Sequence, residues 1–187
     1  RHYSRLFKRA ARALAPQLED RGIDEIYLDL TPLNPGGSRE GARALALELQ
    51  QAVRTATGLS CSLGVAPNKL LAKLCSDLDK PAGITIVAAE DIPARIWPLP
   101  VGKINGIGPK AQERLDRHGI RTIGELAARS RADLRRMLGK SGEQLWLYAN
   151  GLDDSPVRRY EDKPEVKSVS RGMTFRRDLV NMEEVRC

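Results

Sequence analysis

The sequence predicts an α+β fold, in which a mixed sheet with covering helices is followed by a separate group of short helices. Helical and strand-like periodicity alternate through residue 87, as expected for a sheet covered by helices. From residue 89 to residue 151 only helical periodicity is present, and glycines follow the short helical runs. A chain of 187 residues is long enough for one ordinary domain or two small ones. The change in pattern near residue 88 therefore indicates a domain boundary.

Hydrophobic spacing predicts three helices and three strands in the first half. The helices have apolar residues at intervals of three and four, and the strands have them at alternate positions. We expect helices at 3–14, 40–57 and 68–78, and strands at 23–31, 59–65 and 83–87. Pro16 ends the first helix because proline cannot continue it, and Gly58 follows the second, where a left-handed C-cap is expected.

Short helices with tight turns are predicted from residue 89 to residue 151. Three pairs have the spacing of a capping box, or of a variant with a shorter acid: Thr122 with Glu125, Ser130 with Asp133, and Ser141 with Gln144. Residues 153–166 are polar and contain proline, as interdomain linkers do. Residues 167–179 have the pattern of a strand that begins a third module.

Composition narrows the class of protein. The net charge of +7 and the pI near 9.6 favour an anionic partner, either nucleic acid or an acidic lipid. A hydrophobic content of 41% excludes a disordered chain, and aromatics at 4% disfavour recognition built on base stacking. Three cysteines without a CxxC pair indicate a reducing compartment. With no signal peptide and no apolar run of about 20 residues, we expect a soluble, cytoplasmic protein.

The charge is distributed unevenly along the chain. Residues 22–100 carry a net charge of −2, whereas residues 101–150 carry +5. For any one segment, solvated helix faces are the simpler explanation. An acidic centre beside a basic segment is nevertheless the arrangement expected if the two segments have different roles.

Asp24 and Glu25 form an adjacent acidic pair at the start of the predicted strand 23–31. Carboxylates that enter an apolar strand are costly unless they face solvent or bind a cation. Magnesium prefers hard oxygen ligands, and two such ions about 4 Å apart can stabilise an in-line phosphoryl displacement. The pair indicates either a magnesium site or an exposed strand end that the acids cap.

Three lysines accompany the predicted helix 68–78. Lys69 and Lys73 are four residues apart and share one helical face, whereas Lys80 follows the helix in a KPAG turn. A lysine close to bound metal can hold a triphosphate. Three solvated lysines are the alternative.

The segment INGIGPK contains a Gly106-Ile107-Gly108 turn followed by Pro109 and Lys110. Proline fits the first position of a helix, and the amides at the start of that helix point toward the turn. Glycines let these amides approach a phosphate closely, and Lys110 adds a positive charge. This is the helix-hairpin-helix arrangement, which predicts binding to the DNA backbone without sequence preference, the alternative being a plain turn.

Four motifs in order, IDEIYLDLT, LGVAPNKLLAKLCSDLDKPAGI, INGIGPK and KSVSRGMTF, resemble the Y-family translesion DNA polymerases, on the DNA polymerase IV branch. The resemblance extends over nearly the whole chain. It implies the C-terminal part of a catalytic palm at 1–88, a thumb at 89–156, a linker at 157–166 and the start of a little finger at 167–187. The implied fold is a partial palm, then a helix-hairpin-helix thumb and the first little-finger strand.

The resemblance also implies the roles of individual residues. Asp24 resembles the metal-ligating aspartate of the family, Glu25 the neighbouring catalytic glutamate, and Lys80 the lysine that binds the incoming deoxynucleoside triphosphate. Two groups are implied to contact DNA: Gly106, Ile107, Gly108 and Lys110 in the thumb, and Ser170, Arg171 and Thr174 in the little finger. The implied cofactor is Mg²⁺ in a two-metal site, and the implied partners are primer-template DNA and, in the full protein, a sliding clamp.

Two departures from the family pattern bear on activity. Gly22 replaces the serine that usually precedes IDE, and the first palm strand with its leading aspartate, together with the fingers, is not in the sequence. We therefore expect magnesium-dependent, error-prone nucleotidyl transfer in DNA repair from the parent protein, a cytoplasmic, nucleoid-associated enzyme of bacterial type, but none from these residues alone. The alternatives are a non-catalytic polymerase-like accessory protein and a bare helix-hairpin-helix module.

Overall fold

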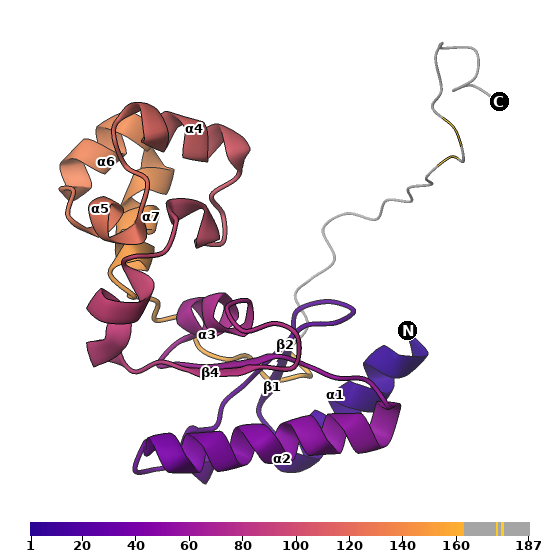
Figure 1. Ribbon diagram of the computed structural model, residues 1–187. Coiled ribbons are helices and arrows are strands. Elements are labelled where there is room, and N and C mark those ends of the chain that lie inside the picture. Colours follow the sequence, from indigo (N-terminus) through magenta and orange to yellow (C-terminus); the bar gives the residue numbers. More distant parts are fainter. Residues whose placement is uncertain (163–174, 176, 178–187) are drawn as a thin grey trace.

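The computed structural model describes residues 1–162, 175 and 177, and most of them form two lobes (Figure 1). One lobe contains the strands, together with the helices α1 (His2–Leu14), α2 (Arg39–Thr57) and α3 (Lys69–Ser76). The other lobe contains α4 (Pro109–Arg117), α5 (Ile123–Ala127), α6 (Arg131–Leu138) and α7 (Lys140–Ala149). Single turns of 3-10 helix lie at Thr31–Leu33, Ala89–Asp91 and Val101–Lys103, and a π-helix at Ile92–Ile96. The predicted α+β class is confirmed.

Two short sheets form the strand layer. β1 (Leu18–Asp20) pairs antiparallel with β2 (Ile26–Leu28), and β3 (Leu63–Val65) pairs parallel with β4 (Ile84–Ile86). The helices α3 and α2 cover opposite faces of the β3–β4 pair (Figure 1). The strands predicted at 23–31, 59–65 and 83–87 are all shorter than expected. β1 was not predicted because Leu18 is the only apolar residue between Pro16 and Gly22, so no alternating pattern marks it.

Local side-chain chemistry sets several helix ends. Asn68 accepts a hydrogen bond from the Leu71 amide and so begins α3. Gly58 has a φ of 74° and ends α2 in the predicted left-handed conformation. The caps at Thr122 and Ser130 are confirmed. The cap predicted at Ser141 is wrong, because the N-cap of α7 is Gly139, two residues earlier, and Ser141 lies in the first turn of the helix.

The largest cluster of buried side chains joins the two lobes. It extends from Leu71 and Leu74 in α3, through Ile96, to Leu115 and Leu145 in the helical lobe. A smaller cluster lies between α1, α2 and β1. The apolar core is therefore continuous across residue 88, and the division into domains at this residue remains a prediction. In the part of the chain that the structure describes, none of the helices has the length and apolar character needed to cross a bilayer.

Candidate functional site

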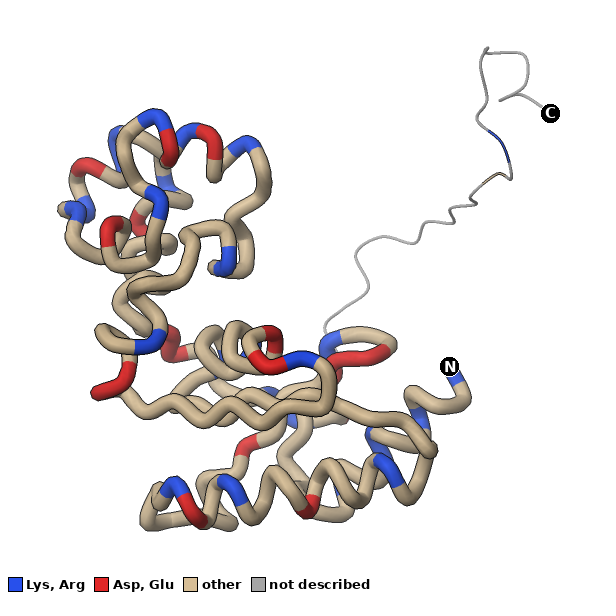
Figure 2. Tube along the Cα trace, in the orientation of Figure 1, with Lys and Arg blue, Asp and Glu red and all other residues tan. Residues whose placement is uncertain are grey.

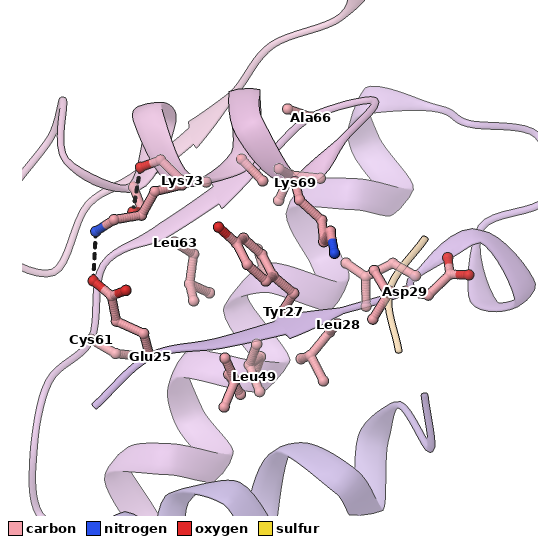
Figure 3. A pocket seen from close by; sticks show the side chains of 18 of the residues that line it. Glu25, Tyr27, Leu28, Asp29, Leu49, Cys61, Leu63, Ala66, Lys69 and Lys73 are labelled. Atoms are coloured by element: carbon pink, nitrogen blue, oxygen red, sulfur yellow. Dashed lines mark hydrogen bonds and ion pairs between the residues drawn. The ribbon is translucent and has the colours of Figure 1, made fainter. Parts of the chain in front are cut away.

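A cavity of about 1020 Å³ opens between β2 and β3 (Figure 3). Each of these strands is paired on one edge only among the described residues, β2 with β1 and β3 with β4. The cavity is also lined by α3, which contributes Lys69 and Lys73, and by the loop that carries Asp24 and Glu25. The fold thus brings the predicted acidic pair and two of the predicted lysines to one open space.

The acidic pair is exposed and lies immediately before β2. Both Asp24 and Glu25 face solvent, and Glu25 Oε1 accepts a hydrogen bond from Lys73 Nζ at 2.6 Å (Figure 3). Asp29, at the other end of the strand, is occupied in a turn, where its Oδ1 accepts from the Thr31 amide at 2.9 Å. Within residues 1–162, 175 and 177, no three acids, histidines or cysteines cluster closely enough to hold a metal. Asp24 and Glu25 are two hard oxygen donors that fit part of a magnesium shell.

An alternating row of charges connects Glu25 to Lys80. Lys73 Nζ contacts both Glu25 and Asp77 Oδ2, the latter at 3.2 Å, and Lys80 Nζ lies 2.6 Å from Asp77 Oδ1. The sequence separates Lys73, on the helix, from Lys80, in the turn that follows the helix, and Asp77 joins them. The Lys80 side chain is 59% exposed, so its ammonium group stays accessible.

The two central groups of this row have shifted pKa values. Burial lowers the pKa of Lys73, but its hydrogen bonds to Glu25 and Asp77 outweigh burial and raise it. Burial raises the pKa of Asp77, but the hydrogen bonds from Lys80 and Lys73 bring it below its ordinary value. Both groups are therefore charged at neutral pH.

Lys69 points to a different partner. Its Nζ lies 2.8 Å from Oε2 of Glu19, a carboxylate on β1 that is only 3% exposed. Sequence reasoning missed Glu19, because LED reads as an ordinary polar stretch after Pro16. No local signal distinguishes Glu19 from the exposed Asp20 beside it, because the burial of Glu19 depends on contacts with distant residues.

The predicted helix-hairpin-helix turn lies on the side of the helical lobe that faces α3. Gly106 has a φ of 99°, a conformation that favours glycine, and Ile107 is buried. Gly108 is the N-cap of α4 and Pro109 its first residue, as expected. Lys110 is exposed on the first turn, and lysines and arginines are spread over the lobe among fewer acids (Figure 2).

A second hollow of about 480 Å³ adjoins both features. It is lined by Lys73 of α3, by the C-cap residue Asp77, and by Lys103, Asn105 and Gly106 at the hairpin. The row of charges and the hairpin are therefore neighbours in space, although about 30 residues separate them in the sequence. Three other predicted site residues, Ser170, Arg171 and Thr174, lie outside the described residues.

Two family models match the chain in the order of these features. Residues 1–77 match the impB/mucB/samB family, and residues 89–120 match the helix-hairpin-helix motif of the same family. DNA polymerase IV of Methanoculleus marisnigri is 43% identical over 167 residues, which are 89% of this chain and 45% of that protein. The chain belongs to the Y family of DNA polymerases. Both the acidic pair and the lysine helix lie within the first matched segment.

Other Y-family members give the same picture. DNA polymerase IV 1 of Bacillus subtilis is 42% identical over 99% of this chain and 44% of its own length. A DinB-family error-prone DNA polymerase from Sulfolobus solfataricus superposes with a TM-score of 0.76 at 28% identity, over 84% of this chain and 47% of that one. An insertion ternary complex of Dbh DNA polymerase gives 0.73 at 29% identity, over 83% and 46%. The chain thus spans less than half the length of these relatives.

Proposed function

We propose that the chain is the C-terminal palm and thumb of a DNA-directed DNA polymerase, in which residues 1–88 carry part of the active site and residues 89–156 bind DNA. The observation that supports this most strongly is the row from Glu25 through Lys73 and Asp77 to Lys80, which lies beside the helix-hairpin-helix turn. Acids that can hold metal, a lysine that can hold phosphate and amides that can bind a DNA backbone are the parts that nucleotidyl transfer needs.

In this proposal Asp24 and Glu25 hold Mg²⁺, which supplies charge stabilisation for the phosphoryl group when bound. The exposure of both carboxylates supports the assignment, because neither has to leave an apolar environment to bind a cation. Lys80 binds the triphosphate of the incoming deoxynucleotide through its exposed ammonium group.

The proposed partner of the hairpin is the backbone of primer-template DNA. The main-chain amides of Gly106 and Gly108 are proposed to bind a phosphate, while the Ile107 amide donates to the Ile104 carbonyl at 3.1 Å and holds the turn between them. Lys110 adds a charge that is insensitive to sequence. Ser170, Arg171 and Thr174 are proposed to follow the template backbone from the module that begins at residue 167. A sliding clamp as partner, a nucleoid location and a role in damage tolerance complete the proposal.

We also propose that these 187 residues do not polymerise alone. Asp24 and Glu25 come from one loop, and a two-metal reaction needs carboxylates from separate strands. The described residues contain no third acid close enough to complete the set. Among the described residues, the facing edges of β2 and β3 pair with no other strand, and the cavity between them supports the proposal that a further strand lies beside the acids in a longer chain.

Primer extension tests the proposed activity. The full-length parent protein, with magnesium and all four deoxynucleotides, is expected to extend a primer on a template, and Asp24→Ala is expected to abolish extension. Glu48→Ala removes an exposed carboxylate from α2 and serves as the control, with extension unchanged. Extension that survives Asp24→Ala contradicts the assignment, and extension by the 187-residue chain contradicts its inactivity.

A non-catalytic, polymerase-like accessory protein is the second candidate. It is favoured by the ion pair between Glu25 and Lys73, since a carboxylate held by lysine can be purely structural. The same assay separates the two candidates. An accessory protein binds duplex DNA and gives no extension in any variant, whereas the polymerase gives extension that depends on Asp24.

A further inference from the structure

Glu19 is a buried carboxylate with three hydrogen-bond donors around it. Lys69 Nζ lies 2.8 Å from Oε2, the main-chain amide of Arg158 donates to the same oxygen at 3.0 Å, and the Arg158 guanidinium donates to Oε1 at 3.1 Å. Burial raises the pKa of Glu19, but these hydrogen bonds outweigh it and hold the pKa below its ordinary value. A charge this deeply buried is tolerated only while its partners stay in place.

The partners come from two distant parts of the chain. Lys69 belongs to α3, whereas Arg158 belongs to the segment that leaves the helical lobe and returns across the sheet. Further contacts hold this segment to the strand-bearing lobe: Asn68 Nδ2 to the Gly151 carbonyl at 2.7 Å, Lys69 Nζ to the Pro156 carbonyl at 2.8 Å, and Gln17 Nε2 to the Val157 carbonyl at 2.8 Å. Residues 151–158 are thus bound by side chains from β1, from the residue before it, and from the start of α3.

Glu19 also belongs to the hairpin that carries the acidic pair. It faces Tyr27 in the β1–β2 register, two residues beyond Glu25. α3 therefore holds the hairpin at two points, through Lys69 at the buried Glu19 and through Lys73 at the exposed Glu25. The buried contact is the stronger constraint, because solvent and salt screen the exposed pair.

We propose that Glu19 is a positioning residue that couples the linker, here residues 151–162, to the β1–β2 hairpin that bears Asp24 and Glu25. While Arg158 is bound, Glu19 is fully compensated and holds β1 against α3. Release of the linker removes two of its three donors and leaves a buried charge with Lys69 alone, which loosens the hairpin. The consequence for catalysis rests on the proposed function of the acids, whereas the coupling itself does not.

Hydrogen exchange followed by mass spectrometry tests the coupling on the 187-residue chain without DNA or nucleotide. Glu19→Gln and Arg158→Met are expected to raise exchange about tenfold in two segments, the hairpin 17–29 and the linker 151–162, because each removes charge-assisted hydrogen bonds. The helices at 123–149 serve as an internal reference and are expected to keep their protection. Arg158→Lys retains a cation for Glu19 and is expected to restore protection in both segments.

Arg12→Met is the matched control. Arg12 also holds the linker, through Glu161 at 2.6 Å and through the Tyr160 ring, but it does not contact Glu19. It is expected to raise exchange at residues 159–162 and to leave the hairpin unchanged, because Arg158 stays bound to Glu19. A rise in the linker alone for Glu19→Gln and Arg158→Met overturns the proposal, as does an equal rise at 123–149 or no rise in either segment. Because no ligand is present, these outcomes leave the proposed polymerase function untouched.

Discussion

The helix-hairpin-helix turn contains two glycines, Gly106 and Gly108, which allow the stability of this turn to be separated from its proposed contact with DNA. Gly106 has a φ of 99°, which an L-residue adopts at a cost of about 1–2 kcal/mol. Gly108 has a φ of −82° and a ψ of 174°, which any residue adopts. In the described structure, a Cβ added at Gly108 has no heavy atom within 4 Å. Such a Cβ would add bulk beside the Gly108 amide, which is proposed to bind a phosphate.

We expect Gly106→Ala to lower the free energy of unfolding by about 1–2 kcal/mol, or the Tm by about 2–8 °C. We expect Gly108→Ala to change it by less than about 0.5 kcal/mol. Alanine is a poorer N-cap than glycine, but it also restricts the unfolded chain, and the two effects oppose each other. Thermal unfolding followed by circular dichroism measures both.

Duplex affinity should respond differently from stability. Gly108→Ala is expected to weaken binding of a labelled duplex about tenfold, which corresponds to the loss of one amide-to-phosphate hydrogen bond. Fluorescence anisotropy at fixed salt measures this. If Gly108→Ala binds the duplex as tightly as the original chain, the hairpin does not approach the backbone closely. If Gly106→Ala is as stable as the original, the conformational argument fails.

Three further predictions concern charge and packing. Lys110→Glu should weaken duplex affinity equally across sequences and reduce the salt slope by about one, so a sequence-selective loss in a salt titration contradicts it. Gly64→Ala should cost about 1–3 kcal/mol in urea unfolding, since its Cβ would clash with the Ala72 carbonyl oxygen in α3. Gly102→Ala, which meets only a flexible glutamine side chain, is its near-neutral control. The depressed pKa of Glu19 stabilises the fold above its unfolded value of 4.5, and this contribution is lost as the pH falls through the lower folded pKa. The free energy of unfolding of Glu19→Gln should therefore fall less steeply in this acid range than that of the original chain, and parallel curves would refute the assignment.

The sequence predicted the elements with strong periodicity and missed those formed by contacts between distant residues. The helices α1, α2 and α3 and the turn at Gly106 follow from local spacing and turn chemistry, and they were predicted within a few residues. β1 could not be predicted, since its three residues gain their conformation from pairing with β2. Arg158 lies in the predicted linker, and its contact with Glu19 could not be predicted because the two residues are 139 positions apart in the chain.

The three lysines that the sequence grouped together have different environments. Lys69 is bound to the buried Glu19, Lys73 bridges Glu25 and Asp77, and only Lys80 keeps a largely exposed side chain. Spacing along a helix places side chains on a face, but it does not say which carboxylates the fold brings to that face. The exposure of Lys80 agrees with the role that the family resemblance implies for it.

The row of charges also explains how an acidic site can exist in a basic chain. Glu25, Lys73, Asp77 and Lys80 alternate in sign, so their formal charges cancel, and the row has an acidic end and a basic end. Asp24 adds a further negative charge at the acidic end. A cation is therefore attracted to one end and a phosphate to the other, whatever the net charge of +7. If the proposed function holds, a metal-bound triphosphate, which carries both charges, is expected to lie with its metal toward Asp24 and its free phosphate oxygens toward Lys80.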